Sequence, residues 1–502
     1  MIKIFAAICW FFVFAKLLFF WVWLWQLKEY HWARFRAYFE SNGLKKFIFS
    51  FYGIRYPKIT LKIVFILLSG VLAGFFILYY LFSFSGYLFY FFLLTSIIFL
   101  PVVFSLLVLF FQIPTEIFKK NVLKKAENKI KEFSNQGGLV VGITGSYGKS
   151  STKEFLAAIL SKKFNVLKTE KNINSEIGIA QTILKKLSPG HQIFVVEIGA
   201  YEKGKIKEVC RMVKPKIGIL TGINEQHLST FGSQENIIKA KFELIESLPK
   251  DGTAILNFDN EYIKAQSLKR KAQGQDAKFK TIRCSTLEKF EIWTENIIIE
   301  KEYIRFKVFS KDGDSADFKM NLLGRQNIEN VLLAVACAKT LGMSLKEISM
   351  ACSKIKSGQG GIKFFKKITC QKTGKYFIVL DSSYSANPTG VIADLDYLKI
   401  YPEKKIVVMP CLIELNKKAE EIHKKIGRKI AEICDLAIIT TNDYFQFIKE
   451  GAREGKIKEE NILLIKDPEE IVTKIKFYGA NSIVLLEGRI PKKVIDLLIN
   501  KI

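Results

Sequence analysis

The sequence predicts an α/β protein with a helical membrane region at its amino terminus. Three long apolar runs lie within the first 113 residues. A glycine-rich turn at residues 142–148 then separates an apolar run from an amphipathic stretch. From there to the carboxyl terminus, short apolar runs alternate with helical patterns, which is typical of parallel sheets flanked by helices. We therefore expect three membrane spans followed by two α/β domains.

The apolar runs cover residues 4–25, 63–84 and 87–112. Each is long enough to cross a hydrocarbon core as a helix. No small-residue cleavage site follows the first run, so we expect it to be retained as a span. Basic residues crowd residues 27–62 and 119–125, whereas the turn Ser85-Gly86 carries none. The positive-inside rule then predicts an amino terminus outside and both basic segments in the cytoplasm.

The chain is strongly basic, with 76 lysines and arginines against 48 acidic residues and a formal net charge of +28. No recognition helix, aromatic RNA platform or zinc finger accompanies this charge, so the sequence predicts no nucleic-acid partner. Lysines beside three spans indicate contact with an anionic membrane lipid surface instead. Solvated surface lysines without a partner of this kind account for much of the excess positive charge. Residues 32–39 mix arginines with aromatics, as a helix at the membrane interface does.

The eight cysteines show no C-x-x-C spacing. They are interpreted as reduced, mostly buried thiols, with neither a zinc site nor a disulfide framework.

A lysine-rich helical linker is expected at residues 116–133, and Asn135-Gln136-Gly137-Gly138 ends it. The first α/β unit then shows strand patterns at residues 139–143, 193–198, 217–220 and 254–257. Period-two alternation from about 279 to 323 predicts a β-meander, and a helix is expected at 327–341. A second unit begins near residue 363, with strands expected at 376–380, 405–409, 436–440, 462–465 and 483–486.

The most informative segment runs from Gly142 to Ser151 and reads G-I-T-G-S-Y-G-K-S-S. A strand, a glycine-rich turn and a helix start form a cradle for phosphate, because backbone N–H groups and the helix dipole face the anion. Lys149 would reach the terminal phosphates, and the hydroxyl of Ser150 or Ser151 would ligate magnesium. The strict G-x-x-x-x-G-K-[ST] pattern fails at Ile143, which leaves T-G-x-x-G-K-S. The alternative is an ordinary glycine turn with a surface lysine.

Further polar residues follow predicted strands. Glu197 ends one strand, and a carboxylate there faces the ligand crevice and suits Mg²⁺. His227 follows the next strand, whereas Lys241 on the following helix has the pattern of a solvated lysine. Asp381 ends a strand in the last unit, and Asn387-Pro388 provides an N-cap and first position for a helix.

Eight segments occur in a characteristic order. They are the loop at 142–151, Asn172 to Gly178, Glu197 to Ala200, Gln226 to Leu228, Ala240-Lys241, Gly324 to Asn330, Asp381 to Pro388, and Ile413 to Leu415 with His423. In this order they resemble the Mur ligases, which are ATP-dependent amide-forming enzymes of peptidoglycan synthesis. The resemblance covers roughly residues 137–502 and implies a P-loop parallel-sheet ATPase domain followed by a Rossmann-like C-terminal domain.

The resemblance also implies roles for individual residues, with ATP and Mg²⁺ as cofactors. The phosphate loop would comprise Thr144, Gly145, Gly148, Lys149, Ser150 and Ser151. The metal ligands would be Ser150, Glu197, His227 and a carbamylated Lys241. Asn327 and Asn330 would contact the adenine side, and Asp381, Tyr384 and Asn387 would come from a closing C-terminal domain. The acceptor would face Asn172, Asn174, Ser175 and Glu176. Of these, Lys149, His227 and Lys241 would be catalytic.

The expected organisation has four parts. They are a transmembrane region at 1–113, a helical linker at 114–136, a central ATP-binding domain at 137–357 and a C-terminal domain at 358–502. By resemblance, the substrates would be a muramoyl-peptide acceptor and D-alanyl-D-alanine, with cell-wall enzymes as further partners. The protein would be a multi-pass protein of the inner (cytoplasmic) membrane, with its catalytic domains in the cytoplasm.

Two departures from the family leave alternatives open. Membrane spans stand where the family carries a uridine-diphosphate-binding domain, which leaves two alternatives: the acceptor is lipid-linked, or another protein holds the nucleotide. The family often has Gly-Arg where the C-terminal domain begins, but this chain reads Gly358-Gln359-Gly360. A ligase for another substrate, such as a glutamyl-chain extender, is one alternative. A nucleotide-binding membrane scaffold without catalysis is the other.

Overall fold

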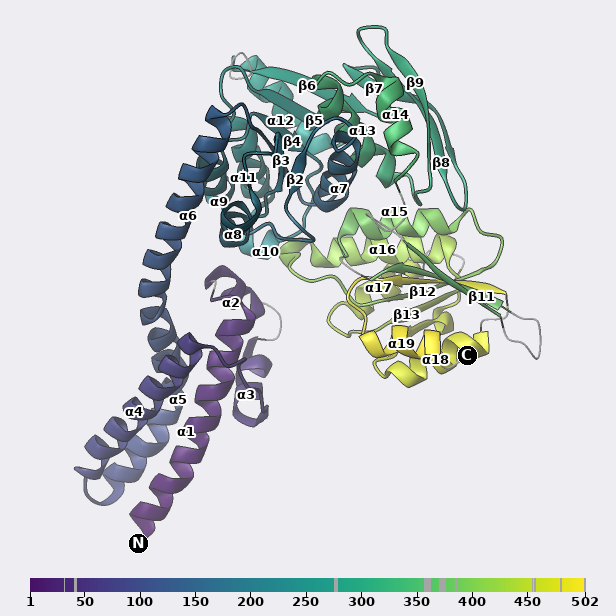
Figure 1. Cartoon of the computed structure of the whole chain (residues 1–502). Helices are drawn as coiled ribbons and strands as arrows, with labels where there is room; N and C mark the ends of the chain where they lie inside the picture. Colours follow the sequence, from purple (N-terminus) through teal and green to yellow (C-terminus); the bar gives the residue numbers. More distant parts are fainter. Residues whose placement is uncertain are drawn as a thin grey trace. The chain divides into compact units, whose positions relative to one another are not determined.

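The computed structural model describes the whole chain except residues 31, 40–42, 275–278, 356–362, 370–375, 384–385, 454, 456, 479–480 and 501–502. The chain divides into two compact units, Met1–Val122 and Leu123–Ile502 (Figure 1). The first is built from helices, and the second contains two β-sheets with helices on their faces.

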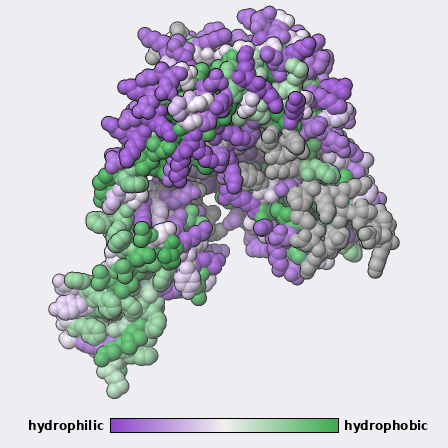
Figure 2. All heavy atoms as spheres, viewed as in Figure 1, coloured by the Kyte–Doolittle hydropathy of each residue, from purple (hydrophilic) through white to green (hydrophobic). Residues whose placement is uncertain are grey.

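Three helices of the first unit correspond to the three apolar runs. They are α1 (Ile2–Leu27), α4 (Leu61–Phe82) and α5 (Gly86–Phe110). Each is long and apolar enough to cross a membrane. Figure 2 shows hydrophobic residues over much of the visible surface of these helices, and a helix that is apolar on every side requires an apolar surrounding. Two shorter helices, α2 (Trp32–Tyr38) and α3 (Gly43–Tyr52), lie between α1 and α4 in sequence.

Helix α4 packs against α1 through two glycines one helical turn apart. A Cβ atom on Gly70 would lie 2.7 Å from Leu18 Cδ1, and one on Gly74 would lie 2.7 Å from Phe14 Cζ. Both positions therefore have no room for a side chain. Small residues at this spacing let two helices approach closely, which is how helices associate where lipid replaces water.

The helix expected at residues 116–133 is confirmed as part of α6 (Gln112–Asn135). Helix α6 begins directly after α5, and it ends where Gly137 adopts a φ of +86°. The Gly138 N–H donates back to the carbonyl of Phe133 at 2.9 Å, which closes the last turn.

The first sheet of the second unit has nine strands in the order β2-β3-β1-β4-β5-β6-β7-β8-β9. The strands are β1 (Leu139–Thr144), β2 (Val166–Lys168), β3 (Ile193–Glu197), β4 (Ile217–Leu220), β5 (Thr253–Asn257), β6 (Lys280–Ser285), β7 (Ile292–Ile299), β8 (Ile304–Ser310) and β9 (Ser315–Met320). The pairing is parallel from β2 through β7 and antiparallel among β7, β8 and β9. The four expected strands are confirmed as β1, β3, β4 and β5. The expected meander is wrong in its first strand, because β6 joins the parallel sheet beside β5.

Helices cover the two faces of this sheet. They are α7 (Lys149–Leu160), α8 (Glu176–Lys186), α9 (Lys205–Val213), α10 (Leu228–Phe231), α11 (Gln234–Glu246), α12 (Glu261–Ala272), α13 (Gln326–Thr340) and α14 (Leu345–Cys352). Val141 and Ile143 of β1 belong to the core beneath α7, α13 and α14. Gly142, between them, faces Leu244 of α11, where an added Cβ would lie 2.9 Å from Leu244 Cδ1. This alternation is the period of two of a strand covered on both faces.

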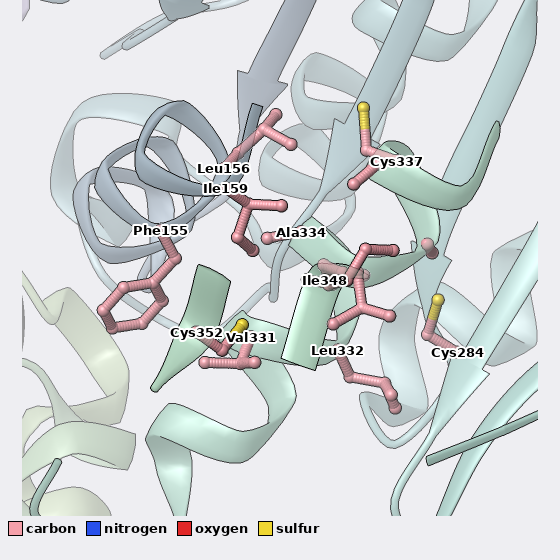
Figure 3. Close-up of a cluster of buried hydrophobic side chains, with 14 of the residues drawn as sticks. Phe155, Leu156, Ile159, Cys284, Val331, Leu332, Ala334, Cys337, Ile348 and Cys352 are labelled. Carbon is pink, nitrogen blue, oxygen red and sulfur yellow. The ribbon is translucent and has the colours of Figure 1, made fainter. Parts of the chain in front are cut away.

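The helix that follows the glycine loop is held firmly by this core. Figure 3 shows Phe155, Leu156 and Ile159 of α7 beside side chains from α13 and α14. Phe155, Leu156 and Ile159 are fully buried. Because interior side chains pack as densely as organic crystals, α7 presents its amino-terminal end at a fixed position.

The second sheet has six strands in the order β10-β11-β15-β12-β13-β14. The strands are β10 (Lys363–Thr369), β11 (Tyr376–Ser382), β12 (Lys404–Met409), β13 (Leu436–Ile439), β14 (Ile462–Leu464) and β15 (Ser482–Glu487). All five expected strands are confirmed. The sequence did not predict β10, which pairs antiparallel with β11 at the sheet edge.

Helices again cover both faces of the second sheet. They are α15 (Pro388–Leu398), α16 (Ala419–Ile433), α17 (Phe445–Ala452), α18 (Pro468–Tyr478) and α19 (Lys492–Asn500), with short 3₁₀ turns at Asn416–Lys418 and Glu459–Asn461. Leu380 and Leu485 belong to the core under α15, α16 and α17, whereas Val379 and Val484 belong to the core under α18 and α19. The result is a parallel sheet with helices on both sides, as a Rossmann-like domain requires.

Candidate functional site

The glycine loop follows β1 and leads into α7 as the sequence predicts. Gly148 has a φ of +76° at the N-cap of α7, and Gly145 has a φ of +156°. A Cβ on Gly145 would lie 2.2 Å from Thr221 Oγ1, so the loop lies directly against the segment after β4. These positions need glycine for both conformation and space. The loop therefore presents backbone N–H groups at a helix amino terminus, which suits an anion.

Lys149 is the first residue of α7, and its side chain folds back over the loop. Its ammonium donates to the carbonyl oxygens of Gly145 at 2.9 Å and Ser146 at 3.1 Å. Burial lowers the pKa of Lys149, while the Glu197 carboxylate raises it. The ammonium thus lies over the place where the loop would hold phosphate.

Glu197 ends β3 and is 1% exposed. The Ser150 hydroxyl donates to its Oε2 at 2.8 Å, and the amide of Asn174 donates to its Oε1 at 3.0 Å. Lys153 donates to the same Oε2 at 3.2 Å. Parallel strands end at one edge of the sheet, which brings the first turn of α7, the end of β3 and the loop before α8 together.

His227 and Glu414 approach each other from the two sheet domains. His227 is the N-cap of α10 and has a φ of +67°. Its Nδ1 lies 2.5 Å from Glu414 Oε2, and its ring meets the ring of Tyr201 edge-on at 4.7 Å. Burial lowers the pKa of His227, Glu414 opposes that effect, and the nearby Lys241 and Lys149 lower it further. A neutral imidazole that donates through Nδ1 keeps Nε2 as a ligand atom.

Lys241 is not solvated, in contrast to the expectation from its sequence context. It is 2% exposed on the inward face of α11, with its Nζ 5.7 Å from the centre of the Phe231 ring. The helical period explains this position, since Ala240, Lys241 and Leu244 are all buried. Burial and the Lys149 charge lower the pKa of Lys241 to about 7, although Glu243 raises it. At neutral pH much of this lysine is therefore a neutral, nucleophilic amine.

The C-terminal domain reaches the loop through Asn224, a residue that the sequence analysis did not single out. The Asn224 backbone N–H donates to Ser146 Oγ at 3.2 Å. Its side-chain amide donates to Asn387 Oδ1 at 2.8 Å and to Thr389 Oγ1 at 3.1 Å. Asn387 is also the N-cap of α15, as expected, and accepts from the Gly390 N–H. One asparagine therefore connects the glycine loop to the second domain.

The other expected residues of the C-terminal domain are placed only in part. Asp381 lies at the end of β11, and its Oδ1 accepts from the Ser383 N–H at 2.9 Å. Tyr384 and Gln359 lie outside the described residues.

The two asparagines of α13 lie behind the loop. Asn330 accepts from Thr152 Oγ1 at 3.4 Å, and a Cβ on Gly148 would lie 2.3 Å from Asn330 Oδ1. Asn327 is fully buried and donates to the carbonyl of Leu323 at 2.7 Å. Asn330 therefore contacts the glycine loop itself, whereas Asn327 contacts its own chain one turn earlier. A contact of either with adenine stays a prediction.

The remaining expected residues surround this centre. Thr144 is buried and donates to the carbonyl of Ile198 at 2.8 Å, and Ser151 lies in the first turn of α7. Asn172 is exposed, Ser175 is the N-cap of α8, and Glu176 is the first residue of α8. Among the hydrogen bonds of the described residues, Thr144 is the only one of these residues that bonds to the chain at the end of β3.

Lys153 and Glu414 are two further site residues to which the sequence assigned no role of their own. Lys153 follows Lys149 by four residues and so shares its helix face, a spacing that is readable from the sequence. The contact of Glu414 with His227 joins residues 187 positions apart, and no local pattern predicts it.

These residues fit a magnesium ion. No cluster of three or more histidine, cysteine or acidic side chains occurs in the described part of the chain. Mg²⁺ does not need one, because it keeps several waters and binds through one or two protein oxygens plus phosphate. The Ser150 hydroxyl and the Glu197 carboxylate supply hard oxygen ligands at the loop, and His227 Nε2 is a further donor atom.

Comparison with known proteins identifies this arrangement. Residues 143–338 match the Mur ligase middle domain, and residues 368–490 match the Mur ligase, glutamate ligase domain. The chain belongs to the Mur ligase family. Its two sheet domains correspond to these two Mur ligase domains, and the glycine loop, Glu197, His227 and Lys241 all lie within the first.

Three curated Mur ligases named UDP-N-acetylmuramoyl-tripeptide–D-alanyl-D-alanine ligase are similar to the chain. The protein of Synechocystis is 31% identical over 61% of this chain and 62% of its own length. The Escherichia coli protein is 31% identical over 57% of this chain and 61% of its own length. The Bacillus subtilis protein is 29% identical over 63% of this chain and 65% of its own length. The chain thus spans less than two thirds of the length of these relatives.

Solved Mur ligase structures share the fold. MurF from Acinetobacter baumannii superimposes with a TM-score of 0.65 and 24% identity, covering 76% of this chain and 80% of its own. MurF ligase from Thermotoga maritima, solved in complex with ADP, gives a TM-score of 0.62 and 23% identity over 76% and 83%.

Proposed function

We propose that the protein is a membrane-anchored, ATP-dependent carbon–nitrogen ligase of peptidoglycan precursor synthesis. One observation carries the proposal: a phosphate-binding loop, the Ser150–Glu197 pair and the buried Lys241 and His227 lie together beside a second domain. Membership of the Mur ligase family supports it. We take the domain boundaries to be those expected from the sequence, at residues 113, 136 and 357.

The loop and Lys149 bind the phosphates of ATP and stabilise the charge that develops on the γ-phosphoryl group. An acceptor carboxylate oxygen forms a bond to the γ-phosphorus while the bond between that phosphorus and the β,γ-bridging oxygen breaks, which releases ADP. An amine then attacks the acyl carbon of the acyl phosphate, inorganic phosphate leaves, and the nitrogen loses a proton to give the amide. Ser150 and Glu197 would hold a magnesium ion, which would neutralise charge between the acceptor carboxylate and the phosphates.

The C-terminal domain excludes water from the acyl phosphate. Asn224 and Glu414 support this role, because both join the first domain to the second beside the loop. Water would hydrolyse the activated acceptor, so closure protects it. Asp381 and Asn387 come from this domain, and we assign them to the nucleotide side of the site.

The Lys241 amine is the proposed site of carbamylation. The nitrogen of a neutral amine forms a bond to the carbon of carbon dioxide and loses a proton, which gives an anionic carbamate that is suited to a metal ligand. The pKa of about 7 supports this chemistry at neutral pH. The roles of Asn172, Asn174, Ser175 and Glu176 toward the acceptor belong to the same proposal.

We propose a muramoyl-peptide as the acceptor and D-alanyl-D-alanine as the amine. The names of the similar ligases support this choice. Phosphate release by the detergent-purified protein tests it, with ATP, Mg²⁺, D-alanyl-D-alanine, and UDP-muramoyl-tripeptide present or absent. Release that needs both substrates and disappears in Lys149→Ala is the expected result. Release only with a lipid-linked muramoyl-peptide would reassign the acceptor, and ATP binding without any turnover would favour a scaffold.

Helices α1, α4 and α5 are proposed to cross the cytoplasmic membrane, with the amino terminus outside. Their length and apolar character support spans, and the basic flanks support the orientation. Protease treatment of intact spheroplasts tests this topology in a protein carrying an amino-terminal epitope. Loss of the epitope with residues 123–502 protected is expected. Protection of the epitope would reverse the orientation.

A further inference from the structure

Lys153 is a fully buried lysine one helical turn after Lys149. Its ammonium has three acceptors from three elements. It donates to the carbonyl of Lys171 and, at 3.2 Å, to Glu197 Oε2, and Glu154 Oε1 lies 3.5 Å away. The three protons of the ammonium thus meet two hydrogen-bond acceptors and one further carboxylate in an ion pair. A charge buried in this way is costly unless it is fully paired, which indicates that its position is specified.

The charges around Lys153 leave it paired chiefly with Glu197. Glu154 forms a second ion pair with Lys168, which is partly exposed. The two cations and the two carboxylates therefore balance. Since Lys168 compensates Glu154, the buried Lys153 compensates Glu197.

Several hydrogen bonds attach the loop at 169–175 to β3 and to the residues that follow it. The Glu197 N–H donates to Thr169 Oγ1 at 3.1 Å. The side-chain amide of Asn174 donates to Glu197 Oε1 at 3.0 Å, and the backbone carbonyl of Asn174 accepts from the Gly199 N–H at 2.9 Å. A Cβ on Gly199 would lie 2.8 Å from Asn174 Cγ, so the loop packs directly on the chain after β3.

Lys153 adds a connection of another kind. Lys171 has a φ of +47°, in the left-handed region, and its carbonyl accepts the Lys153 proton. The same ammonium contacts the carboxylate that Ser150 also contacts. Lys153 thus links the helix of the phosphate loop, the strand-end carboxylate and the backbone of the 169–175 loop through one atom.

We propose that Lys153 is a positioning residue that fixes Glu197 and the 169–175 loop as one unit, so that the metal carboxylate and the acceptor are aligned on the phosphates. The inference rests on the proposed ligase function. Without Lys153, the carboxylate loses one of its three donors and the loop loses its connection to α7. Magnesium-dependent nucleotide binding and acceptor binding then weaken together.

The test compares wild type with Lys153→Met, which keeps the length of the side chain but removes its charge and donors. Isothermal titration with ADP, without and with Mg²⁺, gives the gain in affinity that magnesium provides. We expect ADP affinity without Mg²⁺ to stay within about twofold, because Lys149 and the loop are intact. We expect the magnesium-dependent gain to fall about tenfold, the scale on which outer partners of metal ligands act. The KM for the acceptor rises, with a smaller change in the KM for the amine.

Lys129→Met is the matched control. Lys129 also donates to a backbone carbonyl, that of Leu184, at 3.0 Å, but from α6 to α8. The substitution removes a lysine-to-carbonyl bond away from Glu197, so ADP affinity without Mg²⁺, the magnesium-dependent gain and both KM values should stay unchanged. A lower melting temperature in Lys153→Met with an unchanged magnesium-dependent gain and an unchanged acceptor KM would show a purely structural lysine and overturn the proposal.

A second variant covers the case in which Lys153→Met does not fold. Asn174→Ala removes the side-chain contact between the same loop and Glu197. If the proposal is right, Asn174→Ala lowers the magnesium-dependent gain and raises the acceptor KM together. If neither quantity changes, Glu197 and the 169–175 loop do not act as one unit and the proposal is overturned. Magnesium-linked ADP affinity needs no turnover. Failure of the ligase function therefore leaves this part of the test intact, and the two failures are distinguishable.

Discussion

At the scale of single residues, the site consists of buried charged side chains with different surroundings. Glu197 is surrounded by donors, whereas Lys241 lies near the cation of Lys149 and the Phe231 ring. Desolvation and a neighbouring cation both disfavour the ammonium form. Lys239, two residues earlier on the same helix, pairs with Glu235 at the surface instead. Position on the helix face therefore decides the chemistry of Lys241.

The Lys241 amine provides the first prediction. Protein equilibrated with ¹³C-labelled carbon dioxide should give a carbamate carbon signal in NMR that Lys241→Arg lacks. At fixed dissolved carbon dioxide the signal should rise with pH through about 7, because the reactive neutral amine accumulates above the pKa. Turnover should fall at least about a hundredfold in the variant.

Lys239→Arg is the control for this experiment, since Lys239 is an exposed lysine on the same helix. It should leave the signal and the turnover unchanged. A carbamate signal of equal size in Lys241→Arg would assign the modification elsewhere.

At the scale of elements, glycines decide how closely two segments approach. Gly148 and Gly137 both have positive φ, of +76° and +86°, but their surroundings differ. A Cβ on Gly148 would lie 2.3 Å from Asn330 Oδ1, whereas nothing lies within 4 Å of one on Gly137. Substitution of Gly137 therefore measures backbone strain alone, whereas substitution of Gly148 measures backbone strain and a steric clash together.

Alanine at each glycine gives the second prediction. Gly137→Ala should cost about 1 kcal/mol of stability through backbone strain alone, with ADP affinity unchanged. Gly148→Ala should in addition lower ADP affinity at least about tenfold, because the loop must move to admit the methyl group. Thermal unfolding and ADP titration measure the two effects. Equal ADP affinity in both variants would contradict a phosphate role for this loop.

The contact between α4 and α1 gives the third prediction. Gly74→Leu should destabilise the membrane unit by about 1–3 kcal/mol, because the new side chain meets Phe14. Leu72→Ala changes an exposed side chain on the same helix and should have little effect. Thermal stability in detergent and protease resistance of α1 and α4 measure the difference. Equal resistance of the two variants would contradict the tight contact.

At the scale of the whole molecule, a buried carboxyl pair lies where the second domain meets α13. Gln326 donates to Asp394 Oδ1 at 2.8 Å, and Ser382 donates to Asp394 Oδ2 at 2.5 Å. The Glu487 carboxyl interacts with that of Asp394, and both carboxyls are almost fully buried. Burial raises the pKa of Asp394 to about 6, and burial with the Asp394 charge raises the pKa of Glu487 well above its usual value.

This pair gives the fourth prediction. Because the folded pKa values lie above the unfolded ones, the native state binds protons more tightly, and stability falls as pH rises from about 4 through about 6 and beyond. Glu487→Gln stays neutral and removes the repulsion. It should therefore unfold a few degrees higher than wild type at about pH 8, with a shallower decline. Glu460→Gln changes a surface carboxylate and should unfold at the same temperatures as wild type at every pH. If the unfolding temperature of Glu487→Gln depended on pH just as that of wild type does, the interaction between Asp394 and Glu487 would be contradicted.

Local patterns were sufficient for most of the fold. Apolar length predicted the three long helices, and the alternation of strand and helix patterns predicted nine of the parallel strands, since burial on both faces leaves short apolar runs. The three-residue β2 and the edge strand β10 were missed. A strand that short leaves little pattern, and the lysines of β10 hide its period of two.

The sequence by itself determined the glycine loop, the strand-end Glu197 and the cap at Asn387, because each depends on neighbours a few positions away. Only the tertiary structure decided that Lys241 is buried, that Lys153 contacts Glu197, and that His227 contacts Glu414 across 187 positions. These properties depend on which helix faces a sheet and which sheet edges meet. Packing of distant segments sets both, and no short stretch of sequence contains that information.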